Sequence, residues 1–111
     1  MEILIVRHCE PDYAKDSLTP KGVHEAELLA QRMSKTKMDH IYCSPLGRAQ
    51  KTASYTLSLT GKTAQTLDWL REFEGRREGS IPGHSRVTWD IPPSLWCNEP
   101  KFYTFDQWQE T

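Results

Sequence analysis

The sequence predicts an α/β fold whose strands form a parallel sheet. Residues 2–6 are apolar on both faces, and two later stretches have apolar residues at helical spacing. Each of these predicted helices is followed by a further apolar segment, at 38–43 and at 63–67. Strands that are apolar on both faces are typical of parallel sheets, because helices cover both sides of such a sheet. The alternation of strand and helix therefore indicates repeated βα units.

The first βα unit begins with the apolar segment. The strand over residues 2–6 is expected to end at residues 7–8, and residues 9–12 are expected to form a loop. Thr19 and Pro20 then predict a helix start, since threonine is a good N-cap and proline loses no helical hydrogen bond at the first position. The apolar positions of this helix are Val23, Ala26, Ala30 and Met33.

The second unit repeats this arrangement. An apolar strand over 38–43 is followed by Ser44 and Pro45, which predict a second helix start. Gly61 is expected to end this helix, and residues 63–67 are expected to form a third short strand. The apolar positions of the second helix are Leu46, Ala49 and Ala53.

The composition changes after these units. Residues 1–70 contain the βα units, whereas 71–111 form an excursion rich in proline, glycine and tryptophan. Thr104 and Gln107 have the form of a capping box, so a helix is expected to begin there, although the chain stops at Thr111. Three short strands and two helices also make a small core for such a sheet. We therefore expect the single domain of residues 1–111 to be the N-terminal part of a larger protein.

Charge and composition exclude several classes of partner. The 14 Lys and Arg residues nearly balance 15 Asp and Glu residues, which gives no basic surface for nucleic acid or a membrane. The apolar run at 3–6 is too short to be a signal peptide or a membrane span. Cys9, Cys43 and Cys97 have no paired spacing, and with His40 they match no standard zinc pattern. We expect free thiols, no metal and a cytoplasmic protein.

Two predicted strand ends carry groups that suit phosphate chemistry. Arg7 and His8 follow the first strand, and Ser44 and Arg48 follow the second. Arg48 falls in the first turn of a predicted helix, where free backbone N–H groups and the helix dipole favour an anion. Arginine can hold two phosphate oxygens at once, and a neutral histidine beside it can attack phosphorus. These residues predict a phosphate site with a histidine nucleophile.

Four segments, in this order, resemble the histidine phosphatase superfamily, also called the phosphoglycerate mutase-like family. They are Leu4–Pro11 with its Arg-His pair, Leu18–Gly22, Tyr42–Ala53 with its Ser-Pro-Leu-x-Arg stretch, and Leu70–Phe73. The resemblance covers roughly residues 2–79, and the order and spacing of the segments make it specific. It implies a three-layer sandwich around a parallel sheet, of which this chain provides the N-terminal part.

The resemblance also implies an enzyme and a set of roles. His8 becomes phosphohistidine, Arg7 and Arg48 bind the phosphoryl oxygens, and Glu72 protonates the leaving oxygen. No metal or cofactor is implied. The expected activity is hydrolysis of a small-molecule phosphate monoester. A homodimer is a possible assembly of the protein.

The sequence departs from the family pattern in two places, and these leave alternatives open. Cys9 stands where the family has a glycine. The second family histidine has no counterpart, because His84 follows no apolar strand, so an inactive isolated chain and a non-catalytic phosphate-binding module are both alternatives. A phosphoglycerate mutase-like phosphotransferase is another alternative to the hydrolase. Glu74 and Glu78 are rivals of Glu72 for the role of proton donor.

Overall fold

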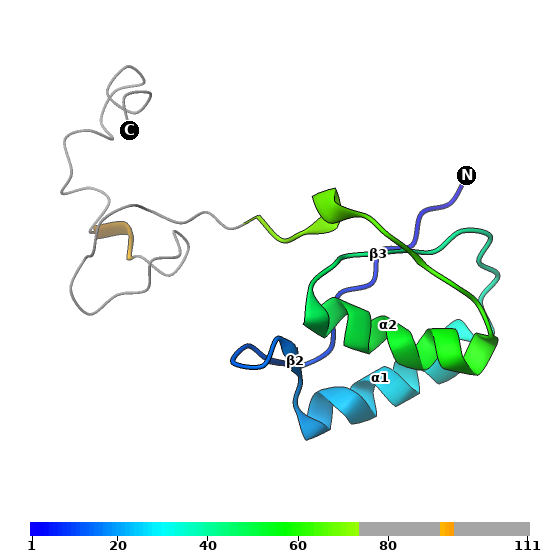
Figure 1. The fold of residues 1–111 in the computed structure, drawn as a ribbon, viewed down its shortest axis with the longest axis horizontal. Helices are drawn as coiled ribbons and strands as arrows, with labels where there is room; N and C mark the ends of the chain where they lie inside the picture. The colour runs from blue at the N-terminus through cyan, green and yellow to red at the C-terminus, as the bar shows by residue number, and fades with distance from the viewer. Residues whose placement is uncertain (74–91, 95–111) are drawn as a thin grey trace, which may run out of the picture. The chain divides into compact units, whose positions relative to one another are not determined.

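The computed structural model of the chain describes residues 1–73 and 92–94. The chain divides into two units, Met1–Arg71 and Glu72–Thr111, and each is described by itself. The first unit contains the helices and strands that position the candidate site (Figure 1). No helix in the described part of the chain is long and apolar enough to span a membrane.

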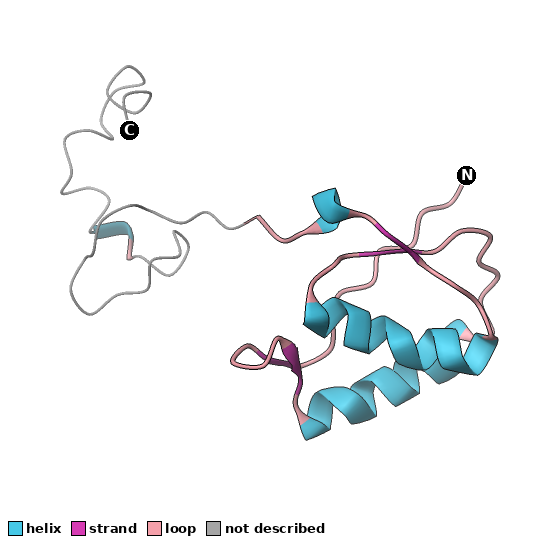
Figure 2. Ribbon diagram, in the orientation of Figure 1, coloured by secondary structure: helices cyan, strands magenta, loops and turns pink. Residues whose placement is uncertain are grey.

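The first unit is α/β, with two helices of 14 residues and two small sheets (Figure 2). The elements in chain order are β1 (Pro11–Asp12), β2 (Ser17–Leu18), α1 (Pro20–Met33), β3 (Tyr42–Cys43), α2 (Gly47–Thr60), β4 (Gln65–Thr66) and the 3₁₀ helix η1 (Asp68–Leu70). Strands β1 and β2 pair antiparallel, and β1 lies within residues 9–12, where the sequence predicted a loop. Strands β3 and β4 pair parallel, Tyr42 opposite Gln65, so the parallel pairing of the second and third predicted strands is confirmed over a shorter length.

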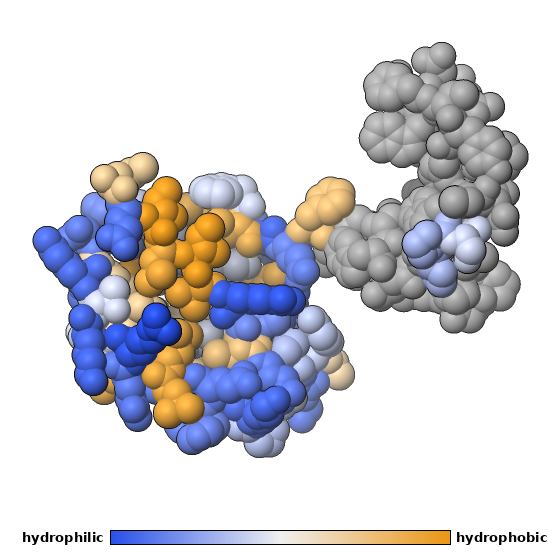
Figure 3. Space-filling view, turned by 180° about the vertical axis from the view of Figure 1, so that it is seen from behind, coloured by the Kyte–Doolittle hydropathy of each residue, from blue (hydrophilic) through white to orange (hydrophobic). Residues whose placement is uncertain are grey.

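The prediction of a buried strand at residues 2–6 is wrong for this structure. This segment has no strand partner among the described residues, and Ile3 and Ile5 are 73% and 90% exposed. A strand that is apolar on both faces needs a paired neighbour and covering helices. Residues 1–71 provide only two short sheets, and hydrophobic surface remains visible on this unit from behind (Figure 3).

The prediction for the first helix is confirmed. Thr19 is the N-cap of α1, and its hydroxyl accepts a hydrogen bond from Gly22 N–H at 3.1 Å, with Pro20 in the first turn. Ala26, Ala30 and Met33 are buried as the spacing predicted, whereas Val23 is half-buried. The small alanine side chains allow α1 and α2 to lie closely side by side, so the helix pair forms the centre of the core.

The second helix begins later than predicted and buries different side chains. Its N-cap is Leu46, which provides no capping side chain, whereas Ser44 Oγ accepts from Leu46 N–H in the preceding turn. Gly61 ends the helix in the left-handed conformation, with φ 67°, as expected. The buried residues of α2 are Thr52 and Thr56, while the predicted apolar positions are only half-buried.

Several predictions lie outside the described residues. They concern the tryptophan-rich excursion, the rival carboxylates Glu74 and Glu78, His84, Cys97 and the helix expected to begin at Thr104.

Candidate functional site

His8 is half-buried, and its position determines which ring nitrogen can react. Its Nδ1 lies 2.8 Å from the carbonyl oxygen of Cys9. A carbonyl oxygen only accepts hydrogen bonds, so Nδ1 carries the proton in this contact. In the neutral ring, Nε2 then holds the lone pair. This arrangement gives His8 the tautomer that a nucleophile requires.

The segment that carries His8 is attached to α2 by a buried threonine. Cys9 N–H donates to Thr52 Oγ1 at 3.1 Å, and the Thr52 hydroxyl donates to the Arg48 carbonyl at 2.9 Å. Thr52 is 4% exposed and lies one turn beyond Arg48 on α2. The structure therefore brings the His8 segment against the first two turns of the helix that carries Arg48.

Arg48 is held by the turn between β1 and β2. Its Nη1 donates to Asp16 Oδ1 at 2.9 Å, and its guanidinium carbon lies 5.3 Å from the centre of the Tyr13 ring. The Arg48 side chain is 13% exposed, so it is not the solvent-facing helix residue that a lone arginine often is. The side chain thus lies against the start of its own helix, where Asp16 also accepts from the backbone N–H of Arg48.

The start of α2 differs from the expected open anion site. Asp16 Oδ2 accepts from Gly47 N–H at 2.6 Å, and Asp16 Oδ1 accepts from Arg48 N–H at 3.2 Å. These hydrogen bonds, that of Gly47 first, hold the pKa of the Asp16 carboxyl below its usual range, so the group is ionised near neutral pH. A carboxylate of the chain itself thus satisfies the first N–H groups of this helix.

The other two predicted residues lie in different surroundings. Arg7 is exposed and precedes His8 in the N-terminal segment. Glu72 is also exposed and is the first residue of the second unit, so its role beside His8 stays a prediction. Through Thr52, the first unit connects the backbone of the His8 segment with the backbone of Arg48.

Cys9 stands where the family pattern has a glycine, and its surroundings disfavour the thiolate. Burial raises the pKa of its thiol, which outweighs the lowering effect of the contact with Thr52, and the nearby charge of Glu25 raises the pKa further. The thiolate is the reactive form of cysteine, so a raised pKa lowers the reactive fraction of this thiol. Residues 1–73 and 92–94 also contain no group of three His, Cys, Asp or Glu side chains that could hold a metal ion.

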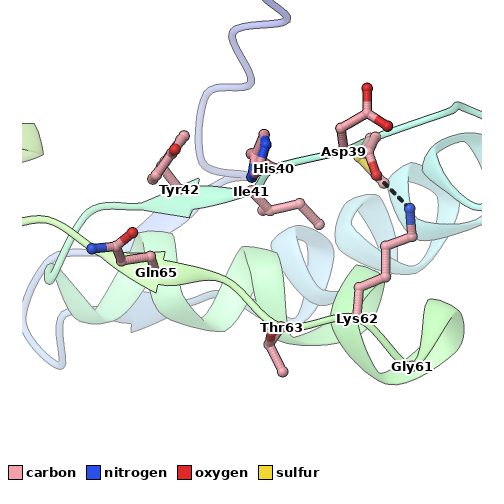
Figure 4. Close-up of a pocket in the computed structure, with 9 residues that line it drawn as sticks. Asp39, His40, Ile41, Tyr42, Gly61, Lys62, Thr63 and Gln65 are labelled. Atoms are coloured by element: carbon pink, nitrogen blue, oxygen red, sulfur yellow. Dashed lines mark hydrogen bonds between the residues drawn. The ribbon is translucent and has the colours of Figure 1, made fainter.

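An open hollow of about 470 Å³ lies elsewhere in the first unit (Figure 4). Residues that precede or begin β3 and β4 line it, including His40, Tyr42, Lys62 and Gln65, and Lys62 Nζ donates to the Met38 carbonyl at 2.6 Å. Ligands of parallel sheets bind at the carboxyl ends of the strands, and this hollow is at the amino ends. It is separate from the region of His8 and Arg48.

Sequence reasoning missed Asp16 and Thr52. Each acts over a long separation in the chain, 31 and 32 residues for the Asp16 contacts with α2 and 43 residues for the contact of Thr52 with Cys9. Thr52 lies within the Ser-Pro-Leu-x-Arg segment that signalled the family, which was the one available indication. No periodicity or local motif marks Asp16.

Comparisons with known proteins identify the family of this chain. The sequence profile of the histidine phosphatase superfamily (branch 1) matches residues 3–110. The chain is 36% identical over 87 residues to "Putative phosphoserine phosphatase 2" of Hydrogenobacter thermophilus, which covers 69% of this chain and 43% of that protein. It is 33% identical over 82 residues to "Probable phosphoglycerate mutase GpmB" of Serratia proteamaculans, which covers 66% of this chain and 38% of that protein. The chain thus spans less than half the length of these relatives.

Proposed function

Because the chain belongs to the histidine phosphatase superfamily, we propose that it hydrolyses a phosphate monoester through a phosphohistidine formed on His8. The observation that carries this proposal is the contact of His8 Nδ1 with the Cys9 carbonyl at 2.8 Å. It leaves Nε2 as the nucleophilic nitrogen, on a segment attached through Thr52 to the helix of Arg48.

The reaction proceeds in two steps. The Nε2 lone pair of His8 forms a bond to phosphorus while the bond from phosphorus to the ester oxygen breaks, and the leaving oxygen takes a proton from the Glu72 carboxyl group. Water then attacks the phosphoryl group, the N–P bond breaks, and the Glu72 carboxylate takes the proton that the water releases. Inorganic phosphate leaves, and both side chains return to their first state.

Arg48 and Arg7 supply the positive charge that phosphoryl transfer requires. The transferred group carries charge on three oxygens, and catalysis depends mainly on placing and stabilising that charge. A guanidinium has five N–H donors in a planar fork that matches the oxygens of a phosphate. In this proposal Arg48, which Asp16 holds in place, binds the phosphoryl oxygens. The exposed Arg7, next to His8 in the chain, binds them as well.

The proposal also covers the fold, the class of substrate and the fate of the phosphoryl group. The parallel pair β3 and β4 and the packed helices support a three-layer sandwich around a parallel sheet. The substrate is a small-molecule phosphate monoester in the cytoplasm. The relatives bear the names of a phosphatase and a mutase, so transfer of the phosphoryl group to a second hydroxyl is the alternative second step.

Trapping the phosphoenzyme tests the proposal. The full chain is mixed with ³²P-labelled phosphoserine or phosphoglycerate, and the protein is analysed for an acid-labile, base-stable label. His8→Ala should abolish the label, whereas His24→Ala should retain it, because His24 is an exposed residue of α1 whose contact is with Glu27. Release of free phosphate indicates the hydrolase, and labelled isomeric product indicates the mutase. An unlabelled parent chain, or a label that survives in His8→Ala, would refute a phosphohistidine on this residue.

A further inference from the structure

The turn between β1 and β2 makes a three-way contact with the start of α2. The carboxylate of Asp16 accepts from Gly47 N–H at 2.6 Å, from Arg48 N–H at 3.2 Å and from Arg48 Nη1 at 2.9 Å. The first two contacts do what a helix cap does. The third contact is not part of the cap, because it involves a side chain and not a backbone N–H group. It fixes the side chain that the proposed function assigns to the phosphoryl group.

The backbone of this turn is shaped for the contact. Asp16 has φ 44°, the one positive φ of a non-glycine residue in the part of the chain that the structure describes. Aspartate and asparagine tolerate this conformation better than most residues. A Cβ on Gly47 would lie only 2.1 Å from the Asp16 carbonyl oxygen, so glycine permits the two backbones to touch. The backbone of the β1–β2 turn at Asp16 therefore lies in direct contact with the first residue of α2, Gly47.

The same turn also contacts the guanidinium through an aromatic ring. Tyr13 places its ring 5.3 Å from the guanidinium carbon of Arg48, within the range of a cation–π interaction. Tyr13 is 67% exposed and the side chain of Asp16 is 45% exposed, whereas that of Arg48 is only 13% exposed. The turn therefore covers Arg48 while its own side chains remain accessible.

We propose that Asp16 is a positioning residue for phosphoryl transfer, because it fixes the guanidinium of Arg48 relative to the backbone of α2. The proposal rests on the proposed function of Arg48. An arginine side chain has several rotatable bonds, and a fixed carboxylate restricts it before the substrate arrives. A misplacement of about 1 Å at a reacting group can reduce the rate about 100-fold, so this restriction has a measurable effect.

The matched variants are Asp16→Asn and Asp12→Asn in the full chain. Asparagine keeps the size of Asp16 and tolerates its positive φ, but it removes the charge that faces Arg48. Asp12 is on the same hairpin, and its carboxylate contacts Ala14 N–H and Lys15. We expect kcat/KM for p-nitrophenyl phosphate to fall about 10- to 100-fold in Asp16→Asn and to be unchanged in Asp12→Asn.

A double-mutant cycle with Arg48→Lys separates positioning from capping. Lysine lacks the planar fork of arginine, so Asp16→Asn should cost little further activity in the Arg48→Lys background. A residue that only caps α2 would have the same effect in both backgrounds. An equal loss in both would therefore overturn the proposal, as would kcat/KM in Asp16→Asn equal to that of the parent.

Binding of vanadate and folding controls complete the test. Millimolar vanadate should raise the unfolding midpoint of the parent and raise it less in Asp16→Asn. A larger increase in the variant would show that Asp16 competes with the anion, and would overturn the proposal. Where Asp16→Asn does not unfold cooperatively, Asp16→Ser is measured, and failure of both would assign Asp16 to folding alone. A parent chain with neither turnover nor a vanadate effect would refute the proposed function itself, and this assignment with it.

Discussion

Replacing Thr52 by valine should loosen the segment that carries His8. Valine has the shape of threonine but no hydroxyl, so it leaves Cys9 N–H without the partner that it has at 3.1 Å. It also removes the donor to the Arg48 carbonyl at 2.9 Å. Thr52 is 4% exposed, so water has little access to replace the hydroxyl from its side of the contact.

The size of the effect follows from this burial. A backbone N–H that loses its partner away from water costs about 1–3 kcal/mol. Cys9 is only half-buried, so we expect the lower part of this range, about 1–2 kcal/mol. In a domain of this size, 1 kcal/mol shifts the unfolding midpoint by about 4–8 °C, so Tm should fall by about 4–16 °C.

Circular dichroism melts of the full chain measure this change. Thr52→Ser keeps the hydroxyl and should recover most of the loss, and Thr56→Val makes the same substitution one turn further along α2, at another buried threonine. Formation of the phosphoenzyme should fall in Thr52→Val and stay normal in Thr56→Val. A Tm in Thr52→Val that equals or exceeds the parent value would show that the contact with Cys9 does not stabilise the fold.

Three further predictions concern the elements around the site. Gly22→Ala should destabilise the chain in urea unfolding, because the new Cβ would lie 2.2 Å from the Glu10 carbonyl oxygen. This clash should outweigh the preference of a helix for alanine over glycine, which is about 1 kcal/mol. A more stable variant would show that the backbone at Glu10 moves away at little cost. Thr19→Ala should cost about 1 kcal/mol in the same assay through loss of the cap on Gly22 N–H, and an unchanged midpoint would contradict that role. Asp16 has a lowered pKa in the folded chain, so its contacts stabilise the fold above about pH 4 and are lost as the pH falls through the lowered value. The acid-induced loss of Tm should therefore be shallower in Asp16→Asn than in the parent, and parallel curves would refute this linkage.

The sequence alone determined the features that depend on neighbouring residues. Thr19 and Pro20 marked the start of α1, and Gly61 marked the end of α2, because a cap is formed by residues within one turn of the helix end. The order of the Arg-His and Ser-Pro-Leu-x-Arg segments was sufficient to indicate the family, which the profile match over residues 3–110 then showed.

Tertiary structure decided the features that depend on distant residues. The apolar pattern of residues 2–6 predicted a buried strand, but a strand forms only where other segments pair with it, and local pattern says nothing about their presence. Ser44 looked like the cap of α2, yet Asp16 takes that role from 31 residues away and holds Arg48 as well. Such contacts have no signature in the local sequence, because the chain must first bring the β1–β2 turn to the helix before any bond can form.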